Sequence, residues 1–110
     1  MPAHTPYLDT PIRRADTDAL EAPTVLDFGT NWCGYCQGAA PRVLAALARH
    51  PGVQHLRIED GPGRRLGRSF GVKLWPTLVF LKHGQEVARV VRPEDDAALE
   101  QALALIDPGA

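Results

Sequence analysis

The sequence predicts an α/β fold in which a central mixed β-sheet of four to five strands is flanked by helices on both faces. Short apolar runs alternate with longer segments whose apolar residues recur every three to four positions, as expected for strands that alternate with helices. Near the carboxyl end, the turn sequence KHGQ joins two apolar runs, which indicates an antiparallel hairpin. The chain has 110 residues, of which 45% are hydrophobic and 23% charged, so we expect a single domain over residues 1–110.

The first part of the chain is predicted to be an irregular arm followed by a short helix. Residues 1–15 are rich in proline and show little periodicity, so we expect this arm to dock through its apolar side chains, Tyr7, Leu8 and Ile12. Asp16 or Thr17 can cap a helix that runs to Ala22, where Pro23 stops it.

A strand, a long helix and a second strand are expected next. Residues 24–28 (TVLDF) are a short run of the β type. From Cys33 to about His50 the apolar residues follow helical spacing, and a proline-glycine pair then ends the helix. Residues 53–58 (VQHLRI) predict the second strand.

The last part of the chain is predicted to hold a short helix, a hairpin and a final helix. The short helix covers residues 64–70, and the hairpin pairs residues 77–81 with residues 86–91. Pro93 is expected to open the last helix, because the acidic residues 94–96 suit its positive N-terminal end.

Charge and hydropathy exclude several classes of protein. A net charge of −1 gives no reason to expect nucleic acid or an anionic membrane as a partner. The longest apolar run, residues 78–81, is far shorter than the roughly 20 residues that cross a bilayer. The N-terminal residues show no basic cluster followed by an apolar stretch, so we expect no secretory signal and a cytoplasmic location.

Both cysteines, Cys33 and Cys36, lie in the segment NWCGYCQ between the first strong strand and the long helix. Loops at the carboxyl ends of such strands carry function. A structural zinc site needs four ligands, and the histidines show no paired spacing. Covalent haem needs a histidine where Gln37 stands, and an iron–sulfur cluster needs more thiolates. A structural disulfide across so short a loop would restrain the unfolded chain little.

A reversible dithiol fits this position better than a metal site or a structural disulfide. Cys33 is expected at the N-terminus of a helix, where free N–H groups and the helix dipole favour a thiolate. Cys36 lies one turn further and can resolve a mixed disulfide formed by Cys33. The pattern therefore predicts thiol–disulfide exchange, with Cys33 as the nucleophile, Cys36 as the resolving thiol and no bound metal.

Over residues 20–107 the chain resembles the thioredoxin family. The resemblance rests on VLDF before the cysteines, on WCGYC, on Pro41 in the following helix, and on WPT entering an apolar strand followed by KHG. It implies a thioredoxin fold and a protein-disulfide oxidoreductase with no bound cofactor and a redox-active Cys33–Cys36 disulfide. It also implies disulfide-containing protein substrates, and electrons that come from NADPH through a flavoprotein thioredoxin reductase. We expect a monomer.

Further site residues follow from the buried strand and from the resemblance. Burial is expected to raise the pKa of the Asp27 carboxyl, which would then take the proton from Cys36. Thioredoxins have an aspartate with this role at the matching position. A lysine usual near that aspartate is absent, and His55 is the nearest candidate. The resemblance makes Pro76 a cis-proline that faces the cysteines, and it implies a substrate surface made of Trp32, Gly34, Tyr35, Trp75 and Pro76.

The chain departs from the family pattern at several positions around the cysteines. Tyr35 stands where most thioredoxins have proline, Gly29 where they have tryptophan, and Gln37 where they have lysine. Trp75 replaces a small aliphatic residue, and Arg92 stands near a usual glycine. We expect Tyr35 to make the protein less reducing than a typical thioredoxin, and Trp75 and Arg92 to narrow or redirect the substrate surface.

Some features keep more than one interpretation. A basic cluster is interpreted as a solvated helix face, with a docking patch for an acidic partner as the alternative; its members are Arg57, Arg64, Arg65, Arg68 and Lys73. Two other functions also stay open. One is a binding or holdase module that works without turnover, and the other is an oxidant or isomerase in an oxidising compartment.

Overall fold

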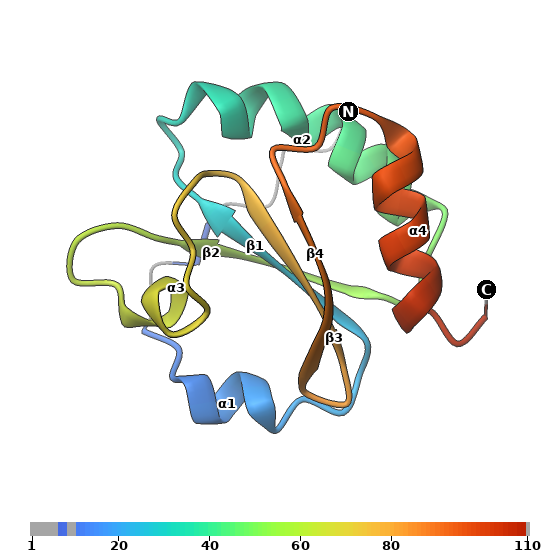
Figure 1. Cartoon of the computed structure of the whole chain (residues 1–110), viewed down its shortest axis with the longest axis horizontal. Coiled ribbons are helices and arrows are strands. Elements are labelled where there is room, and N and C mark those ends of the chain that lie inside the picture. Colours follow the sequence, from blue (N-terminus) through green and yellow to red (C-terminus); the bar gives the residue numbers. More distant parts are fainter. Residues whose placement is uncertain (1–6, 9–10, 110) are drawn as a thin grey trace.

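The computed structural model describes residues 7–8 and 11–109, and their arrangement confirms the predicted α/β fold (Figure 1). The elements follow in the order α1 (Arg14–Asp18), β1 (Thr24–Gly29), α2 (Gly34–Ala48), β2 (Gln54–Glu59), α3 (Arg65–Ser69), β3 (Thr77–Lys82), β4 (Gln85–Val91) and α4 (Asp96–Ile106).

The four strands form one mixed sheet in the order β2-β1-β3-β4. β1 runs parallel to β2 and antiparallel to β3, and β3 and β4 form an antiparallel hairpin. The hairpin turn consists of His83 and Gly84, whose φ angles of 50° and 77° suit a two-residue turn of type I′. Because β1 is central, the loop that follows it starts in the middle of the sheet.

Helices cover both faces of this sheet (Figure 1). On one face, Val43 of α2 and Leu103 of α4 pack with Val25 and Phe80. On the other face, α3 packs against the sheet, and the rings of Phe28 and Phe70 lie 5.9 Å apart. Burial on both faces explains why β1 and β3 are almost continuous apolar runs.

The N-terminal arm reaches the outer edge of β2. Leu8 forms a parallel bridge with Ile58, in which its N–H donates to the Arg57 carbonyl at 2.7 Å and its carbonyl accepts from the Glu59 N–H at 3.1 Å. Tyr7 is buried, and Ile12 packs against the core on the α3 side. The arm predicted over residues 1–15 otherwise lies partly outside the described residues, and its last two positions belong to α1.

Two helices begin at other residues than the sequence predicts. In α1, Asp16 is not the cap: its carboxylate accepts the Arg13 N–H at 3.0 Å, so the helix begins at Arg14, and it ends at Asp18 instead of Ala22. In α4, the Asp95 carboxylate accepts the Ala98 N–H at 3.0 Å, so the helix begins after Asp95 and not at Pro93. Helices start where a side-chain oxygen satisfies a free N–H group.

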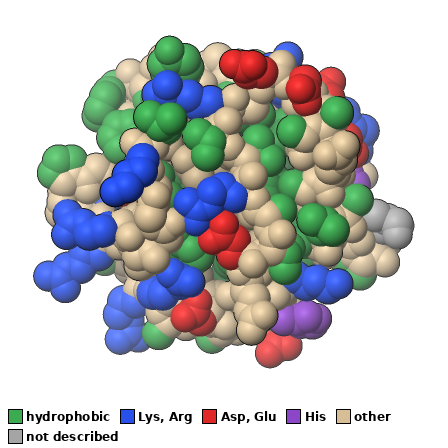
Figure 2. Space-filling view, viewed as in Figure 1, with side chains coloured by type: hydrophobic (Ala, Val, Ile, Leu, Met, Phe, Trp, Pro, Cys, Tyr) green, Lys and Arg blue, Asp and Glu red, His purple; other side chains and the backbone are tan. Residues whose placement is uncertain are grey.

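The predicted basic cluster is mostly a solvated surface, with one exception. Figure 2 shows Lys and Arg side chains gathered at the left of the view, over α3. Arg65, Arg68 and Lys73 are exposed. Arg57 is buried, so its assignment to a solvated face is wrong. Arg57 lies on β2, which pairs with the central strand β1, and its side chain points into the molecule toward Asp27.

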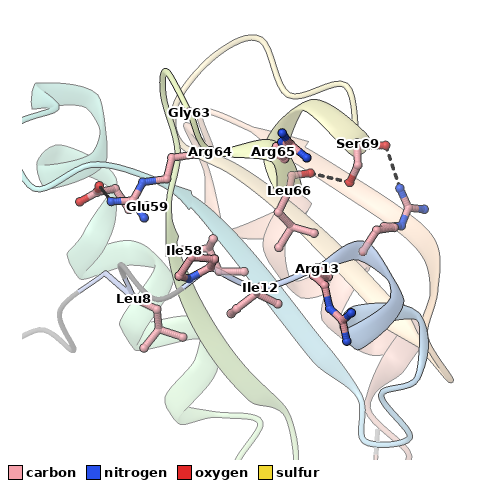
Figure 3. A pocket seen from close by; sticks show the side chains of 12 residues that line it. Leu8, Ile12, Arg13, Ile58, Glu59, Gly63, Arg64, Arg65, Leu66 and Ser69 are labelled. Atoms are coloured by element: carbon pink, nitrogen blue, oxygen red, sulfur yellow. Dashed lines mark hydrogen bonds and ion pairs between the residues drawn. The ribbon is translucent and has the colours of Figure 1, made fainter.

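A cavity of about 450 Å³ lies between the arm and α3 (Figure 3). Its apolar lining comes from Leu8, Ile12, Ile58 and Leu66, and several arginines also border it. None of the predicted site residues lines this cavity.

Candidate active site

The two cysteines lie where β1 passes into α2. Cys33 is the N-cap of α2, with φ −81° and ψ 118°, and its sulfur accepts the Cys36 N–H at 3.2 Å. The Gln37 side chain donates to the Asn31 carbonyl at 2.8 Å and closes the loop in front of the helix. The structure therefore confirms the predicted position of Cys33 at a helix N-terminus.

Both thiols are free and largely buried, and they are not equivalent. Cys33 is 7% exposed and Cys36 only 2%. Burial, and then the hydrogen bond with Cys33, raises the pKa of Cys36 to about 11. The Cys36 thiol is therefore protonated at neutral pH, and it needs a base before it can attack.

Asp27 is a buried carboxyl held by two basic side chains of β2. Its Oδ2 lies 2.9 Å from His55 Nε2 and 3.7 Å from Arg57 Nε. The expectation that His55 is a basic neighbour of Asp27 is met. Arg57 was missed as a site residue. The signal that could have found it is strand register, because a parallel ladder that pairs Asp27 with Arg57 puts both side chains on one face.

Asp27 lies on the face of the sheet that carries α2. It is two residues from Val25, and side chains two apart on a strand point to the same face. Val25 packs in the core that includes Val43 and Ala46 of α2. Asp27 therefore lies on the side of the sheet that the cysteine-bearing helix covers.

Tyr7 also belongs to the site, although the sequence did not identify it as such. Its ring packs with Cys33 and Cys36, and the Arg57 guanidinium lies 4.0 Å from the ring centre. A Cβ at position 29 would lie 2.7 Å from the Tyr7 hydroxyl oxygen and 3.2 Å from the ring. Tyr7 thus occupies space next to Gly29, which explains why position 29 has no side chain.

Aromatic side chains surround the cysteines on the surface. Trp32 is 75% exposed and Tyr35 is 63% exposed. The rings of Trp32 and Trp75 meet edge to face at 5.6 Å, and the Trp75 indole N–H donates to Asp60 at 2.8 Å. Gly34, the first residue of α2, is exposed beside them.

Pro76 and Arg92 lie next to these aromatic side chains. Pro76 is buried, and its peptide bond with Trp75 is cis, as the resemblance implied. Arg92 has a φ of 48°, in the region that favours glycine. Its guanidinium lies 3.8 Å from the centre of the Tyr35 ring, and its Nε donates to the Trp75 carbonyl at 2.9 Å. The structure thus brings three departures from the family pattern into direct contact.

The described part of the chain holds neither a metal-binding cluster nor a helix suited to cross a membrane. No group of three or more His, Cys, Asp or Glu side chains there is placed to hold a metal ion. Within the same residues, no helix has both the length and the apolar character that crossing a membrane requires.

Comparison with known proteins connects this site with one family. The sequence model described as thioredoxin matches residues 14–105. A thioredoxin of Mycobacterium tuberculosis is 36% identical over 98 residues, which cover 84% of this chain and 82% of that protein. An H-type thioredoxin of Fagopyrum esculentum is 31% identical over 77 residues, 70% of this chain and 66% of that protein, so the match spans just under two thirds of that relative.

The same similarity appears in solved structures. The structure of thioredoxin 2 from Pseudomonas aeruginosa PAO1 in its reduced form is 50% identical, with a TM-score of 0.86, and the match covers 98% of this chain and 100% of that one. A thioredoxin from Nicotiana alata is 30% identical with a TM-score of 0.71, covering 86% of this chain and 81% of that one.

Proposed function

The chain belongs to the thioredoxin family of protein-disulfide oxidoreductases, and we propose that Cys33 and Cys36 are the thiols with which it reduces disulfides in other proteins. The observation that carries this proposal is the N-cap position of Cys33, whose sulfur accepts the Cys36 N–H at 3.2 Å. That N–H has no acceptor inside the helix, so an anionic sulfur is stabilised there by the hydrogen bond and by the helix dipole.

In the first step, the Cys33 thiolate attacks one sulfur of a substrate disulfide. A bond forms between Cys33 and the substrate, the substrate disulfide breaks, and its other sulfur leaves as a thiolate. The exposed rings of Trp32 and Tyr35, together with Gly34, Trp75 and Pro76, are the proposed surface for the substrate chain.

In the second step, Cys36 resolves the mixed disulfide. Its thiol must first lose a proton, and the proposed base is Asp27, acting directly or through water. The Cys36 thiolate then attacks the Cys33 sulfur and the substrate leaves as its second thiolate. The protein retains a Cys33–Cys36 disulfide, and two electrons have passed to the substrate.

The remaining step returns the protein to its dithiol form. Thioredoxins act on disulfide substrates and are reduced by a reductase. For this chain we propose a flavoprotein thioredoxin reductase that draws electrons from NADPH, with no cofactor bound to the chain itself. We further propose that it works as a monomer in the cytoplasm.

Insulin reduction tests the proposal. With NADPH and a thioredoxin reductase, we expect the wild-type protein to reduce insulin and the Cys33→Ser variant to lose this activity. The Cys36→Ser variant is expected to accumulate a mixed disulfide through Cys33, which mass spectrometry of the intact adduct detects. Arg65→Ala, which removes an exposed charge on α3, serves as a control. Insulin reduction by Cys33→Ser at the wild-type rate would overturn the proposal.

The comparisons favour this function over a binding or holdase module that works without turnover. The same variant separates the two, because a module that only binds keeps its biological function when Cys33 is replaced by serine. The decisive comparison is therefore made in a strain that lacks the gene for this protein. If Cys33→Ser restores growth as well as the wild type does, the protein only binds; if it does not, the redox function stands.

A further inference from the structure

The Tyr7 hydroxyl is a buried polar group that makes no well-formed hydrogen bond with another described residue. Its residue is only 7% exposed and forms a small cluster with Cys33 and Cys36. A hydroxyl in such a place has lost its hydrogen bonds to water, which costs free energy until a partner replaces them. Besides burial and the charge of Asp27, an interaction with Cys36 already contributes to the raised pKa of Tyr7, so the Cys36 sulfur is the candidate partner, and it becomes a stronger acceptor as a thiolate.

The space around Gly29 indicates that the Tyr7 hydroxyl and the Cys36 sulfur lie close together. A Cβ at position 29 would lie 2.5 Å from Cys36 Sγ and 2.7 Å from the Tyr7 hydroxyl oxygen. Both atoms therefore border the same small space, which stays open because position 29 has no side chain. The backbone bridge between Leu8 and Ile58 holds the arm, and with it Tyr7, in this position.

Burial, more than the charged groups around it, keeps the Tyr7 hydroxyl protonated. Burial, and then the negative charge of Asp27, raises the pKa of Tyr7 far above its ordinary value, while the Arg57 guanidinium acts in the opposite direction. Burial also raises the pKa of Cys36, and the Tyr7 hydroxyl is among the groups that lower it. A hydroxyl that stays protonated next to a forming thiolate can donate a charge-assisted hydrogen bond.

We propose that Tyr7 donates a hydrogen bond to the Cys36 sulfur as that sulfur becomes a thiolate, and so speeds the resolution of the mixed disulfide. This role rests on the proposed function of the cysteine pair. The Cys36 proton goes to the base, the Cys36–Cys33 bond forms, the Cys33–substrate bond breaks, and the electron pair leaves with the substrate thiolate. Tyr7 keeps its own proton throughout. It stabilises the reacting sulfur but exchanges neither protons nor electrons in this step.

The test is the Tyr7→Phe variant, which removes the hydroxyl and keeps the ring. Reduction of dithiobis(nitrobenzoate) releases one coloured thiolate when Cys33 attacks and a second when Cys36 resolves, so stopped-flow absorbance separates the two steps. We expect an unchanged first phase and a second phase that is about tenfold slower near neutral pH. The first phase in the same sample is the internal control.

The pH profile distinguishes this role from a packing role. Once the pH exceeds the pKa of Cys36 in both proteins, its sulfur is ionised without help, so the difference between Tyr7→Phe and the wild type should disappear. Asp27 and Arg57 act on Tyr7, Cys33 acts on Cys36, and His55 lies against Asp27; all four residues remain in both proteins. An NMR titration of the Cys36 Cβ should show a higher pKa in the variant.

The outcomes separate this inference from the proposed function. Two phases in the wild type, with the same second phase in Tyr7→Phe, would overturn the role of Tyr7 alone. Equal slowing of both phases, or a variant that does not fold, would assign the hydroxyl to the fold and also overturn it. A first phase that persists at the wild-type rate in Cys33→Ser would overturn the proposed function itself.

Discussion

Arg92 and Trp75 are joined at the rim of the active site, where the Arg92 Nε donates a hydrogen bond to the Trp75 carbonyl oxygen at 2.9 Å. The same guanidinium lies over the Tyr35 ring at 3.8 Å. A single arginine therefore connects the loop before β3 with the first turn of α2. A substrate chain that pairs with the Trp75 backbone has to compete with this side chain.

The Arg92→Gly variant should reduce insulin faster than the wild type. Removing the guanidinium opens the Trp75 carbonyl and the Tyr35 ring to substrate, and glycine accepts the φ of 48° found at this position. We expect kcat/KM to rise about two- to tenfold, the range of one ordinary hydrogen bond. The wild type should also react more slowly with insulin and with thioredoxin reductase than an ordinary thioredoxin, and equal rates would contradict this explanation.

Asp27→Asn should slow disulfide exchange by about a hundredfold or more at neutral pH, because a general base typically contributes about 10²- to 10⁴-fold. Asparagine keeps the shape of the side chain beside His55 and Arg57 but cannot take the Cys36 proton. Because the pKa of Cys36 is about 11, the rate of the variant should approach that of the wild type as the pH rises toward this value. Asp27→Ala should retain the fold by circular dichroism and show the same defect. Unchanged reduction kinetics in both variants would exclude Asp27 as the base.

Tyr35→Pro should make the protein more reducing. Position 35 lies in the first turn of α2, where proline is tolerated because its missing N–H would have no acceptor inside the helix. Proline stiffens the loop between the cysteines and removes the ring on which Arg92 lies. We expect the reduction potential to fall by about 30 mV or more on equilibration with glutathione. A wild-type potential at or below roughly −270 mV would show that Tyr35 does not make the protein less reducing.

His50→Gln should lower stability most in mildly acidic solution. His50 Nε2 lies 2.8 Å from Glu100, and Nδ1 lies 2.5 Å from Asp107. These hydrogen bonds, first that with Glu100, raise the pKa of His50. The resulting stability is fully present below the ordinary histidine pKa of about 6.5, and it is lost as the pH rises through the raised value.

Thermal unfolding at several pH values measures this effect. The wild type should melt roughly 5 °C above His50→Gln near pH 6, and the gap should narrow toward about pH 9. It should also narrow in strong acid, because hydrogen bonds with His50 lower the pKa values of Glu100 and Asp107, and that stability is lost as the pH falls through those values. A gap independent of pH would mean that His50 acts through packing alone.

The order of strands and helices, and the place of the cysteines at the start of a helix, could be predicted from the amino-acid sequence. Both follow from local patterns: apolar spacing, turn residues, and the position of Cys33 between a short apolar strand and a periodic segment. The cis-proline entering β3 came from the family resemblance in WPT. The helix starts at Arg14 and Asp96 were missed because a single capping hydrogen bond decides each of them, and neighbouring acidic residues compete for that role.

Which distant side chains meet the cysteines depends on how the folded chain packs, and the sequence did not predict it. Tyr7 reaches Cys36 because a backbone bridge to β2 holds the arm, and Arg57 reaches Asp27 through the register of two parallel strands. Arg92 meets Tyr35 and Trp75 because the end of β4, the first turn of α2 and the loop before β3 come together in the folded chain. Such contacts join residues far apart in the chain, and no local period of the sequence encodes them.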